Sequence, residues 1–152
     1  PPFADYQMRG RTYRFMAETP AYCFGHGLSY TTFEYTDVAL SRAHIQAGQT
    51  VELSVRVRNT GPRAGDEVVQ VYLRDVEASV PVPRVKLCGA TRISLAPGEQ
   101  KSVSVHIPEQ AFQAYDDKGA PRIETGVFEL FVGGGCPRQE GVRGQWTSLT
   151  VT

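Results

Sequence analysis

Residues 51–58 read VELSVRVR, a run in which apolar and polar side chains alternate without a break. Successive side chains of a β-strand point to opposite faces, so this period of two predicts a strand that buries one face and exposes the other. The next four residues, NTGP at 59–62, have the composition of a turn and end the strand.

Alternating or strongly apolar segments of similar length recur along the chain on the C-terminal side of this strand. The clearest are residues 68–74, 91–95, 102–107, 127–132 and 146–151. Turn residues separate them, as at Pro97-Gly98 and at the predicted hairpin turn Asp116-Asp117-Lys118-Gly119. About seven to eight strands at intervals of roughly ten residues, with no long helical period, predict an all-β fold, an antiparallel β-sandwich.

Two of these strands also predict which side chains form the core. Phe128, Leu130 and Val132 share one side of the most apolar strand, whereas Val127, Glu129 and Phe131 share the other. In residues 68–74, valine and leucine alternate on one side, but Val68 and Tyr72 add apolar surface to the second side. We therefore expect the strand at 68–74 to be covered on both faces.

Residues 1–27 contain several prolines, glycines and aromatic residues without clean periodicity, which predicts an extended, irregular arm. The arm leads into FGHGLSYTTF at 24–33, where Gly25 and Gly27 permit a tight bend. The aromatic residues of this region are typical of protein interfaces and of sugar-stacking surfaces. They are Tyr6, Tyr13, Phe15, Tyr22, Phe24 and Tyr30.

Several segments resemble family-three glycoside hydrolases, the β-glucosidases and β-xylosidases. They are FGHGLSYTTF at 24–33, NTG at 59–61, AGDEVVQVYL at 64–73, LAPGE at 95–99 and ETGVFELFVG at 124–133. Cys23 stands where that family usually has proline, and Cys88-Gly89-Ala90 also departs from its pattern. The match covers most of the chain and keeps the family's order.

The resemblance implies an immunoglobulin/fibronectin-III-like β-sandwich at residues 28–152, preceded by an arm at 1–27 that connects it to a catalytic domain. We therefore expect this chain to be part of a longer protein. The resemblance further implies that the parent hydrolyses terminal non-reducing β-D-glucosyl or β-D-xylosyl residues with retention, and it favours a secreted or periplasmic location. The family's nucleophile and acid/base residues lie in domains that precede this one.

No catalytic residue is predicted in the chain itself. Retaining glycoside hydrolysis needs two carboxyl groups roughly 5–5.5 Å apart across a sugar pocket. The adjacent acids Asp66-Glu67 and Asp116-Asp117 would point to opposite faces of a strand or into solvent. His26, His44 and His106 have no metal-ligand spacing, so we expect neither a metal nor a cofactor.

Composition narrows the range of partners. Sixteen basic and sixteen acidic residues cancel, which removes the broad positive field that attracts nucleic acid or anionic lipid. No apolar run approaches the roughly 20 residues of a membrane-spanning helix. The three cysteines are too few and too widely spaced for a disulfide framework, and at least one must be free or bonded between chains.

The first functional hypothesis is a non-catalytic accessory domain that docks against, and so stabilises, the catalytic domains of its own parent chain. Its expected contact residues are Arg11, Tyr13, Phe15, Tyr22, Phe24 and His26. A second hypothesis is a module that binds plant oligo- or polysaccharide, for which the strands offer only Tyr72, Phe131 and Trp146 as stacking residues. A third is an independent adhesion or assembly domain.

Overall fold

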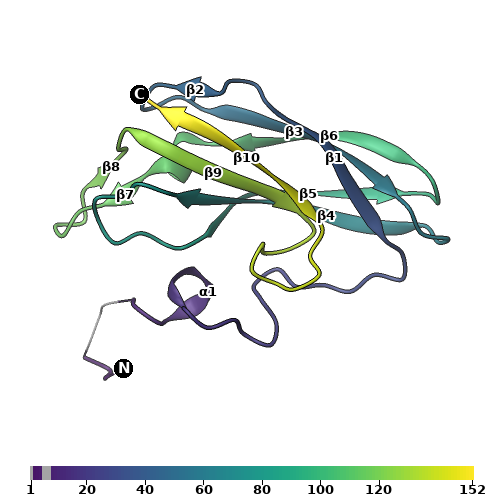
Figure 1. Ribbon diagram of the computed structural model, residues 1–152, viewed down its shortest axis with the longest axis horizontal. Helices are drawn as coiled ribbons and strands as arrows, with labels where there is room; N and C mark the ends of the chain where they lie inside the picture. The colour runs from purple at the N-terminus through teal and green to yellow at the C-terminus, as the bar shows by residue number, and fades with distance from the viewer. Residues whose placement is uncertain (1, 5–7) are drawn as a thin grey trace.

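The computed structural model describes residues 2–4 and 8–152, which form two facing sheets with an arm below them (Figure 1). Within these residues the strands are β1 (Phe33–Leu40), β2 (His44–Ile45), β3 (Val51–Asn59), β4 (Gly65–Asp75), β5 (Lys86–Leu95), β6 (Gln100–Ile107), β7 (Ala114–Tyr115), β8 (Pro121–Arg122), β9 (Gly126–Gly133) and β10 (Gly144–Val151). Two short helices accompany them, α1 (Thr12–Phe15) and the 3₁₀ turn η1 (Glu109–Phe112).

The two sheets have the strand orders β1-β3-β6 and β2-β10-β9-β4-β5, and β7 and β8 form a separate hairpin. The predicted strand at 51–58 is confirmed as β3, which lies at the centre of the three-stranded sheet with strictly alternating burial. The all-β sandwich is likewise confirmed. The predicted turn at 116–119 joins β7 to β8, with the Asp116 amide donating to the Ala120 carbonyl at 3.1 Å.

The main core lies between the sheets. Phe128, Leu130 and Val132 of β9 point into it as predicted, and Phe128 meets the ring of Phe112 edge-on at 5.3 Å. Val51, Leu53 and the other inward residues of β3 face them from the opposite sheet. Every buried residue of this core lies between Phe33 and Val151, so the arm contributes nothing to it.

Three details differ from the sequence expectations. β2 pairs in parallel with β10, because the connection between β1 and β3 leaves its own sheet and follows the edge of the other. The described strands number ten, of which seven have eight or more residues and three are pairs of two residues. The arm also contains one helical turn, α1, closed by the Met16 amide bonding the Thr12 carbonyl.

Asn59 closes the end of β3 that lies nearest the arm. Its side chain is fully buried and accepts hydrogen bonds from Thr31 and from the Gly61 amide. The same amide group donates to the carbonyls of Arg63 and Leu95. Asn59 therefore links the segment before β1, the turn after β3 and the end of β5. These contacts give the asparagine of the NTG segment a structural role.

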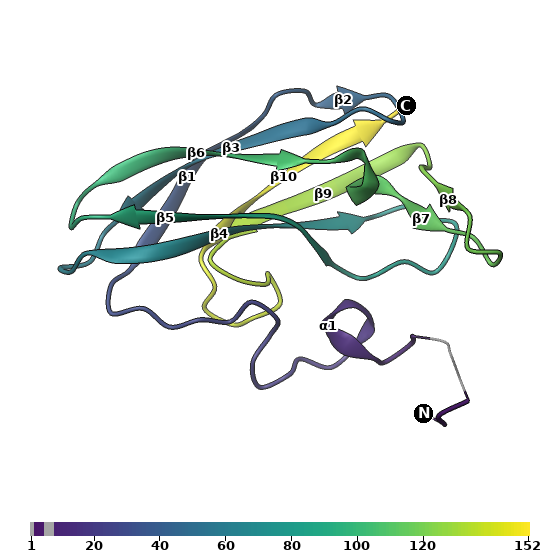
Figure 2. The ribbon, with the colours of Figure 1, turned by 180° about the vertical axis from the view of Figure 1, so that it is seen from behind.

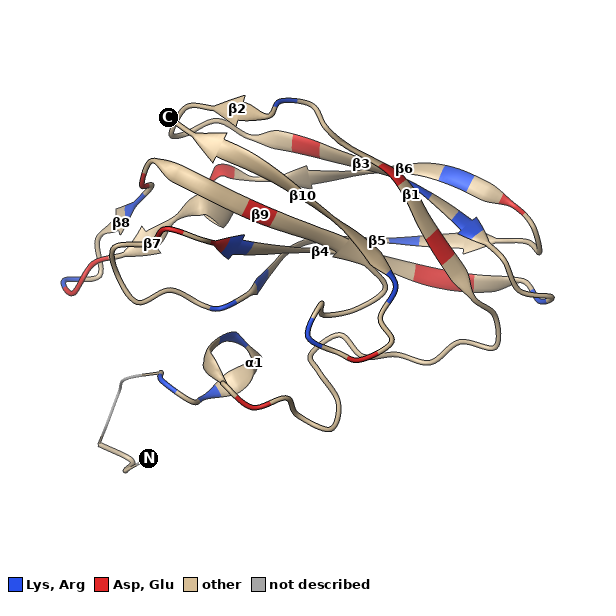
Figure 3. Cartoon of the chain, in the orientation of Figure 1, with Lys and Arg blue, Asp and Glu red and all other residues tan. Residues whose placement is uncertain are grey.

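Acidic and basic residues are interspersed along both sheets (Figure 3). Ion pairs such as Arg56 with Asp37 and Arg122 with Glu124 lie at the surface. Among the described residues, neither helix has the length or hydropathy that crossing a bilayer requires.

Candidate interdomain surface

The arm lies over the outer face of the five-stranded sheet, on the side away from the main core, as the two opposite views show (Figures 1 and 2). Tyr72 of β4 and Phe131 of β9 are buried there together with Val85 and two cysteines, Cys23 and Cys136. Tyr13, Leu87 and Val142 pack around this second cluster. The prediction that β4 is covered on both faces is confirmed, and the arm supplies part of the cover.

Polar contacts fix the arm to the sheet at several points. The guanidinium group of Arg138, in the loop between β9 and β10, donates to the carbonyls of Met16, Ala17 and Glu18 at 2.7–3.0 Å. The Arg84 amide donates to the Arg14 carbonyl at 2.7 Å. Sequence reasoning missed Arg138 because it follows a glycine-rich segment that carries no signal for a partner so distant in the chain.

Gln70 of β4 anchors the glycine turn of the arm. Its Nε2 donates to the carbonyls of Gly25 and Gly134, at 3.1 and 3.3 Å, and its Oε1 accepts from the Tyr72 hydroxyl. The Phe24 carbonyl, 3.1 Å from the same hydroxyl, is a second acceptor for its single proton. The only sequence signal for Gln70 was its polarity within an apolar strand.

Gly25 is the glycine that this turn requires. Its φ is +78°, and a Cβ there would overlap Gln70 Oε1 and lie 2.6 Å from the Tyr72 hydroxyl. Gly27, by contrast, has no positive φ, and a Cβ added to it would have no atom within 4 Å. The expectation that both glycines serve the bend is therefore correct for Gly25 and wrong for Gly27.

The predicted contact residues divide into two groups. Tyr13 and Phe24 stack on one another with ring centroids 4.3 Å apart, and the Tyr13 hydroxyl accepts a hydrogen bond from the Leu87 amide. Tyr22 and His26 form a second pair with centroids 4.9 Å apart. The first pair helps to hold the arm on the sheet through the Tyr13 hydroxyl. Tyr22 of the second pair keeps 72% of its surface exposed.

Arg11 and Phe15 are half-buried at the two ends of α1, and Arg11 donates to the Pro2 carbonyl at 3.2 Å. An open, mostly apolar groove of about 690 Å³ lies along this segment. Its lining includes three members of the two aromatic pairs, Tyr13, Tyr22 and Phe24, together with Phe15, Met16 and Pro20. The six predicted residues thus lie along one segment, although Arg11 and His26 are outside the groove. Tyr6 lies outside the described residues.

Two of the most exposed apolar residues follow directly after the predicted set. Leu28 is 94% exposed and Tyr30 is 89% exposed. Arg63 lies over the Tyr30 ring at 6.0 Å, whereas the Leu28 side chain is left almost entirely uncovered. The sequence marked Leu28 only as part of the FGHGLSYTTF string, because exposure in an extended segment has no periodic signature.

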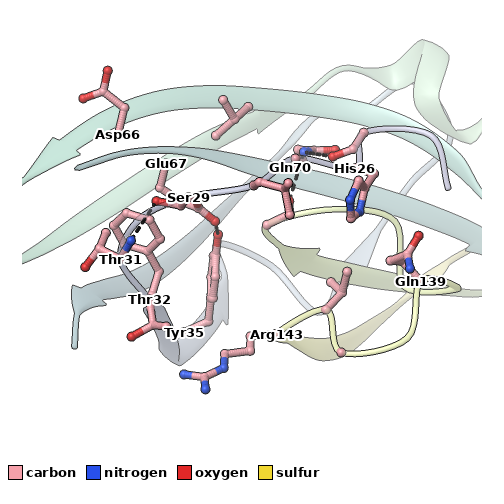
Figure 4. A pocket seen from close by; sticks show the side chains of 18 of the residues that line it. His26, Ser29, Thr31, Thr32, Tyr35, Asp66, Glu67, Gln70, Gln139 and Arg143 are labelled. Carbon is pink, nitrogen blue, oxygen red and sulfur yellow. Dashed lines mark hydrogen bonds between the residues drawn. The ribbon is translucent and has the colours of Figure 1, made fainter. Parts of the chain in front are cut away.

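A second pocket of about 460 Å³ lies between residues 25–35, β4 and the loop before β10 (Figure 4). Tyr35 and Glu67 lie at one end of it and His26 and Gln139 at the other. The Tyr35 hydroxyl donates to Glu67 at 2.5 Å. Burial raises the pKa of Glu67, the Tyr35 hydrogen bond opposes that rise, and burial together with the Glu67 charge raises the pKa of Tyr35.

The acid pair Asp66-Glu67 does not form a hydrolytic pair. Asp66 points away from Glu67 (Figure 4) and accepts hydrogen bonds from Ser94 and Arg92. The Ser94 and Arg92 hydrogen bonds lower the pKa of Asp66, which lies at the rim of the same pocket. In the part of the chain that the structure describes, no group of three or more His, Cys, Asp or Glu side chains is placed to hold a metal ion.

Two of the three strand residues considered for stacking on a polysaccharide are not available to it. Tyr72 and Phe131 are buried beneath the arm and the loop before β10, so they offer no ring to a sugar. Trp146 of β10 remains about half exposed, with its ring packed against Phe131 at 5.2 Å and under Arg74 at 5.5 Å. A flat row of exposed aromatic rings is absent from the described strands of this sheet.

The sequence of this chain matches a known domain family and several known proteins. Residues 67–136 match the fibronectin type III-like domain family. Thermostable β-glucosidase B of Acetivibrio thermocellus is 38% identical over 75% of this chain, and the periplasmic β-glucosidase of Salmonella typhimurium is 44% identical over 77%. A putative β-xylosidase of Formosa agariphila is 40% identical over 80% of the chain.

Solved structures agree with these sequence matches. A β-glucosidase from Erythrobacter marinus superimposes on 95% of this chain with a TM-score of 0.79 and 37% identity. A β-glucosidase from Listeria innocua in complex with glucose covers 87% with a TM-score of 0.77 and 31% identity. The chain spans between 15% and 18% of the length of these relatives. It belongs to the fibronectin type III-like domains found in the β-glucosidases and β-xylosidases of glycoside hydrolase family three.

Proposed function

We propose that this chain is a non-catalytic accessory domain of a family-three β-glycosidase and that it stabilises the catalytic domains of its own parent. The observation that carries the proposal is the apolar surface of the arm and of the segment that directly follows it, residues 28–30. Tyr22, Leu28 and Tyr30 leave most of their surfaces exposed, while the arm beneath them is held by hydrogen bonds to the sheet. A fixed backbone that presents apolar side chains outward is suited to docking.

The occupant of this surface is the preceding catalytic domain of the same chain. The relatives are whole glycosidases, and this chain spans only 15% of the length of the first two of them. Arg11, Tyr13, Phe15, Tyr22, Phe24 and His26 are proposed contacts, and Leu28 and Tyr30 join them. Burying such residues in an interface fixes the relative positions of two domains within one chain.

The parent's reaction is proposed from the same relatives. They are named as β-glucosidases and β-xylosidases, which supports hydrolysis of terminal β-D-glucosyl or β-D-xylosyl residues. Within this chain, Glu67 is paired to Tyr35 and Asp66 faces away from it. That arrangement favours a structural role for the domain and leaves the chemistry to carboxylates elsewhere in the parent.

The docking proposal is tested with the double variant Leu28→Ser/Tyr30→Ser in the full-length parent and in the isolated domain. We expect the isolated domain to keep its melting temperature, because both side chains are exposed. The full-length protein should melt at a lower temperature and lose activity at temperatures where the wild type is stable. Tyr115→Ser is the matched control, since Tyr115 is exposed on the distant β7–β8 hairpin.

Unchanged melting of the full-length double variant would contradict docking through this surface. Retention of the isolated domain on insoluble xylan or cellulose would instead favour polysaccharide binding, and a docking domain should pass through both unretarded. Self-association of the isolated domain in a sizing experiment would favour the adhesion or assembly hypothesis.

A further inference from the structure

The three cysteines lie in two different environments. Cys23 of the arm and Cys136 of the loop after β9 are both buried, at 5% and 1% exposure, in the same cluster on the outer face of the five-stranded sheet. Cys88 of β5 packs against the main core, and its thiol lies 3.3 Å from the Val71 carbonyl. The sheet therefore separates Cys88 from the other two.

One residue holds the backbones of Cys23 and Cys136 together. The Gln139 amide donates to the Cys136 carbonyl at 3.0 Å, and the Gln139 side-chain oxygen accepts from the Cys23 amide at 2.8 Å. Gln70 adds a second bridge two residues away on each side, between the carbonyls of Gly25 and Gly134. The segments around Cys23 and Cys136 thus run side by side with little freedom to separate.

The two side chains belong to one buried cluster, and each thiol lies in the other's electrostatic environment. Burial raises the pKa of Cys136, and the neighbouring Cys23 raises it further through charge and hydrogen bonding. Burial raises the pKa of the nearby Tyr72 hydroxyl, and Cys136, Tyr13 and Cys23 raise it further. A thiol with a raised pKa is rarely a thiolate at neutral pH, so it reacts slowly while it remains covered.

From this arrangement we propose that Cys23 and Cys136 are a disulfide-forming pair that covalently ties the arm to the sandwich. The oxidant is a disulfide such as oxidised glutathione. One cysteine thiolate attacks a glutathione sulfur, and the glutathione disulfide bond breaks to release one glutathione thiolate. The second cysteine thiolate then attacks the protein sulfur of the mixed disulfide and releases the other glutathione. The protein loses two hydrogen atoms, and oxidised glutathione is reduced to two thiols.

The bond would act on the element that carries the proposed docking residues, although its formation does not depend on the docking proposal. It would close a loop of roughly 110 residues between the arm and the last hairpin, which restricts the unfolded chain strongly. In the folded state it would hold residues 22–28 on the sheet. The arm's apolar side chains would then remain in position even when no partner covers them.

The test uses the isolated domain carrying Cys88→Ser, refolded in a mixture of oxidised and reduced glutathione. We expect intact mass spectrometry to show the loss of two hydrogen atoms and no free thiol, and peptide mapping to find Cys23 joined to Cys136. The oxidised form should melt roughly 5–10 °C above the same protein reduced with dithiothreitol. Amide exchange in residues 13–27 should slow on oxidation.

Two matched variants show whether the effect belongs to this pair. Cys23→Ser and Cys136→Ser, each in the Cys88→Ser background, should show no change of melting temperature or arm exchange between oxidising and reducing conditions. Two free or glutathione-capped thiols in the Cys88→Ser domain after refolding would overturn the proposal. A map of the wild-type domain that joins Cys88 to either of the other cysteines would overturn it as well.

Discussion

Gly25 and Gly27 are only two positions apart in the sequence, yet they have different roles in the structure. Gly25 adopts a left-handed conformation with Gln70 and Tyr72 directly over the missing side chain, whereas the space around Gly27 is open. A Cβ at position 25 would both strain the backbone and displace the hydrogen bonds that anchor the arm. Neither the backbone conformation nor the surroundings of position 27 in the described part of the domain require a glycine.

We expect Gly25→Ala to destabilise the isolated domain by about 1–3 kcal/mol, the usual scale for a strained backbone conformation. Gly27→Ala, its matched control, should change the free energy of unfolding by less than about 0.5 kcal/mol. Urea unfolding of the three proteins compares them. Equal effects of the two substitutions would show that the contacts around Gly25 do not anchor the arm.

Glu67 is an acid whose pKa is raised by burial in the fold. Because its pKa is raised in the folded state, the folded protein binds the proton more tightly than the unfolded chain does. The stabilisation of the fold by protonated Glu67 is therefore fully present below the ordinary pKa of glutamate. It is lost as the pH rises through the raised pKa. Ionised Glu67 costs stability at neutral pH.

Glu67→Gln should accordingly be more stable than the wild type at neutral pH, and the two proteins should converge as the pH falls below the ordinary glutamate range. The amide can still accept the Tyr35 hydrogen bond. Chemical unfolding as a function of pH measures the difference, with the exposed Glu34→Gln on β1 as control. A difference that is independent of pH would mean that Glu67 does not titrate differently in the fold.

At the scale of single elements, β9, like β4, contributes side chains to the clusters on both sides of the five-stranded sheet. Phe128, Leu130 and Val132 reach the main core, while Phe131 reaches the cluster beneath the arm. Truncating Phe128 to alanine should destabilise the domain by about 3–5 kcal/mol, because it leaves a cavity against Phe112. Glu129→Ala, on the half-exposed outer side, should cost less than about 1 kcal/mol in the same thermal or urea unfolding assay.

The arm is an element that stabilises the domain without supplying its main core. It contributes Tyr13 and Cys23 to the second cluster and no residue to the main core. Deleting residues 1–20 should leave one cooperative thermal transition at a lower midpoint, since Arg138 loses its three carbonyl partners. Differential scanning calorimetry of both lengths tests this, and loss of all cooperative unfolding would show that the sandwich requires the arm.

At the scale of the whole molecule, the carboxylates are distributed in a way that does not support glycoside hydrolysis. Asp66 and Glu67 point apart, and the Asp116 carboxylate accepts hydrogen bonds from the amides of Lys118 and Ala120 within its own turn. We expect the isolated domain to hydrolyse neither aryl-β-glucoside nor aryl-β-xyloside above the uncatalysed rate. Turnover that Glu67→Gln or Asp116→Ala abolishes would overturn the accessory-domain proposal.

The strand pattern was predictable from the sequence because a period of two is a local property. Val51–Asn59 and Gly126–Gly133 bury the side chains that their alternation indicated. The resemblance carried by the FGHGLSYTTF and AGDEVVQVYL segments is likewise a matter of local order along the chain, and the relatives confirm it. Turn chemistry located the β7–β8 hairpin for the same reason.

Only the tertiary structure decided what lies on the second face of the five-stranded sheet. Arg138 and Gln139 contact the arm from more than 100 residues away, and no local pattern records such a meeting. The same holds for the parallel pairing of β2 with β10 and for the shared burial of Cys23 and Cys136, which spacing alone left open. Long-range contacts depend on how the sheets bring distant segments together, whereas the sequence determines chiefly which side of each strand is apolar.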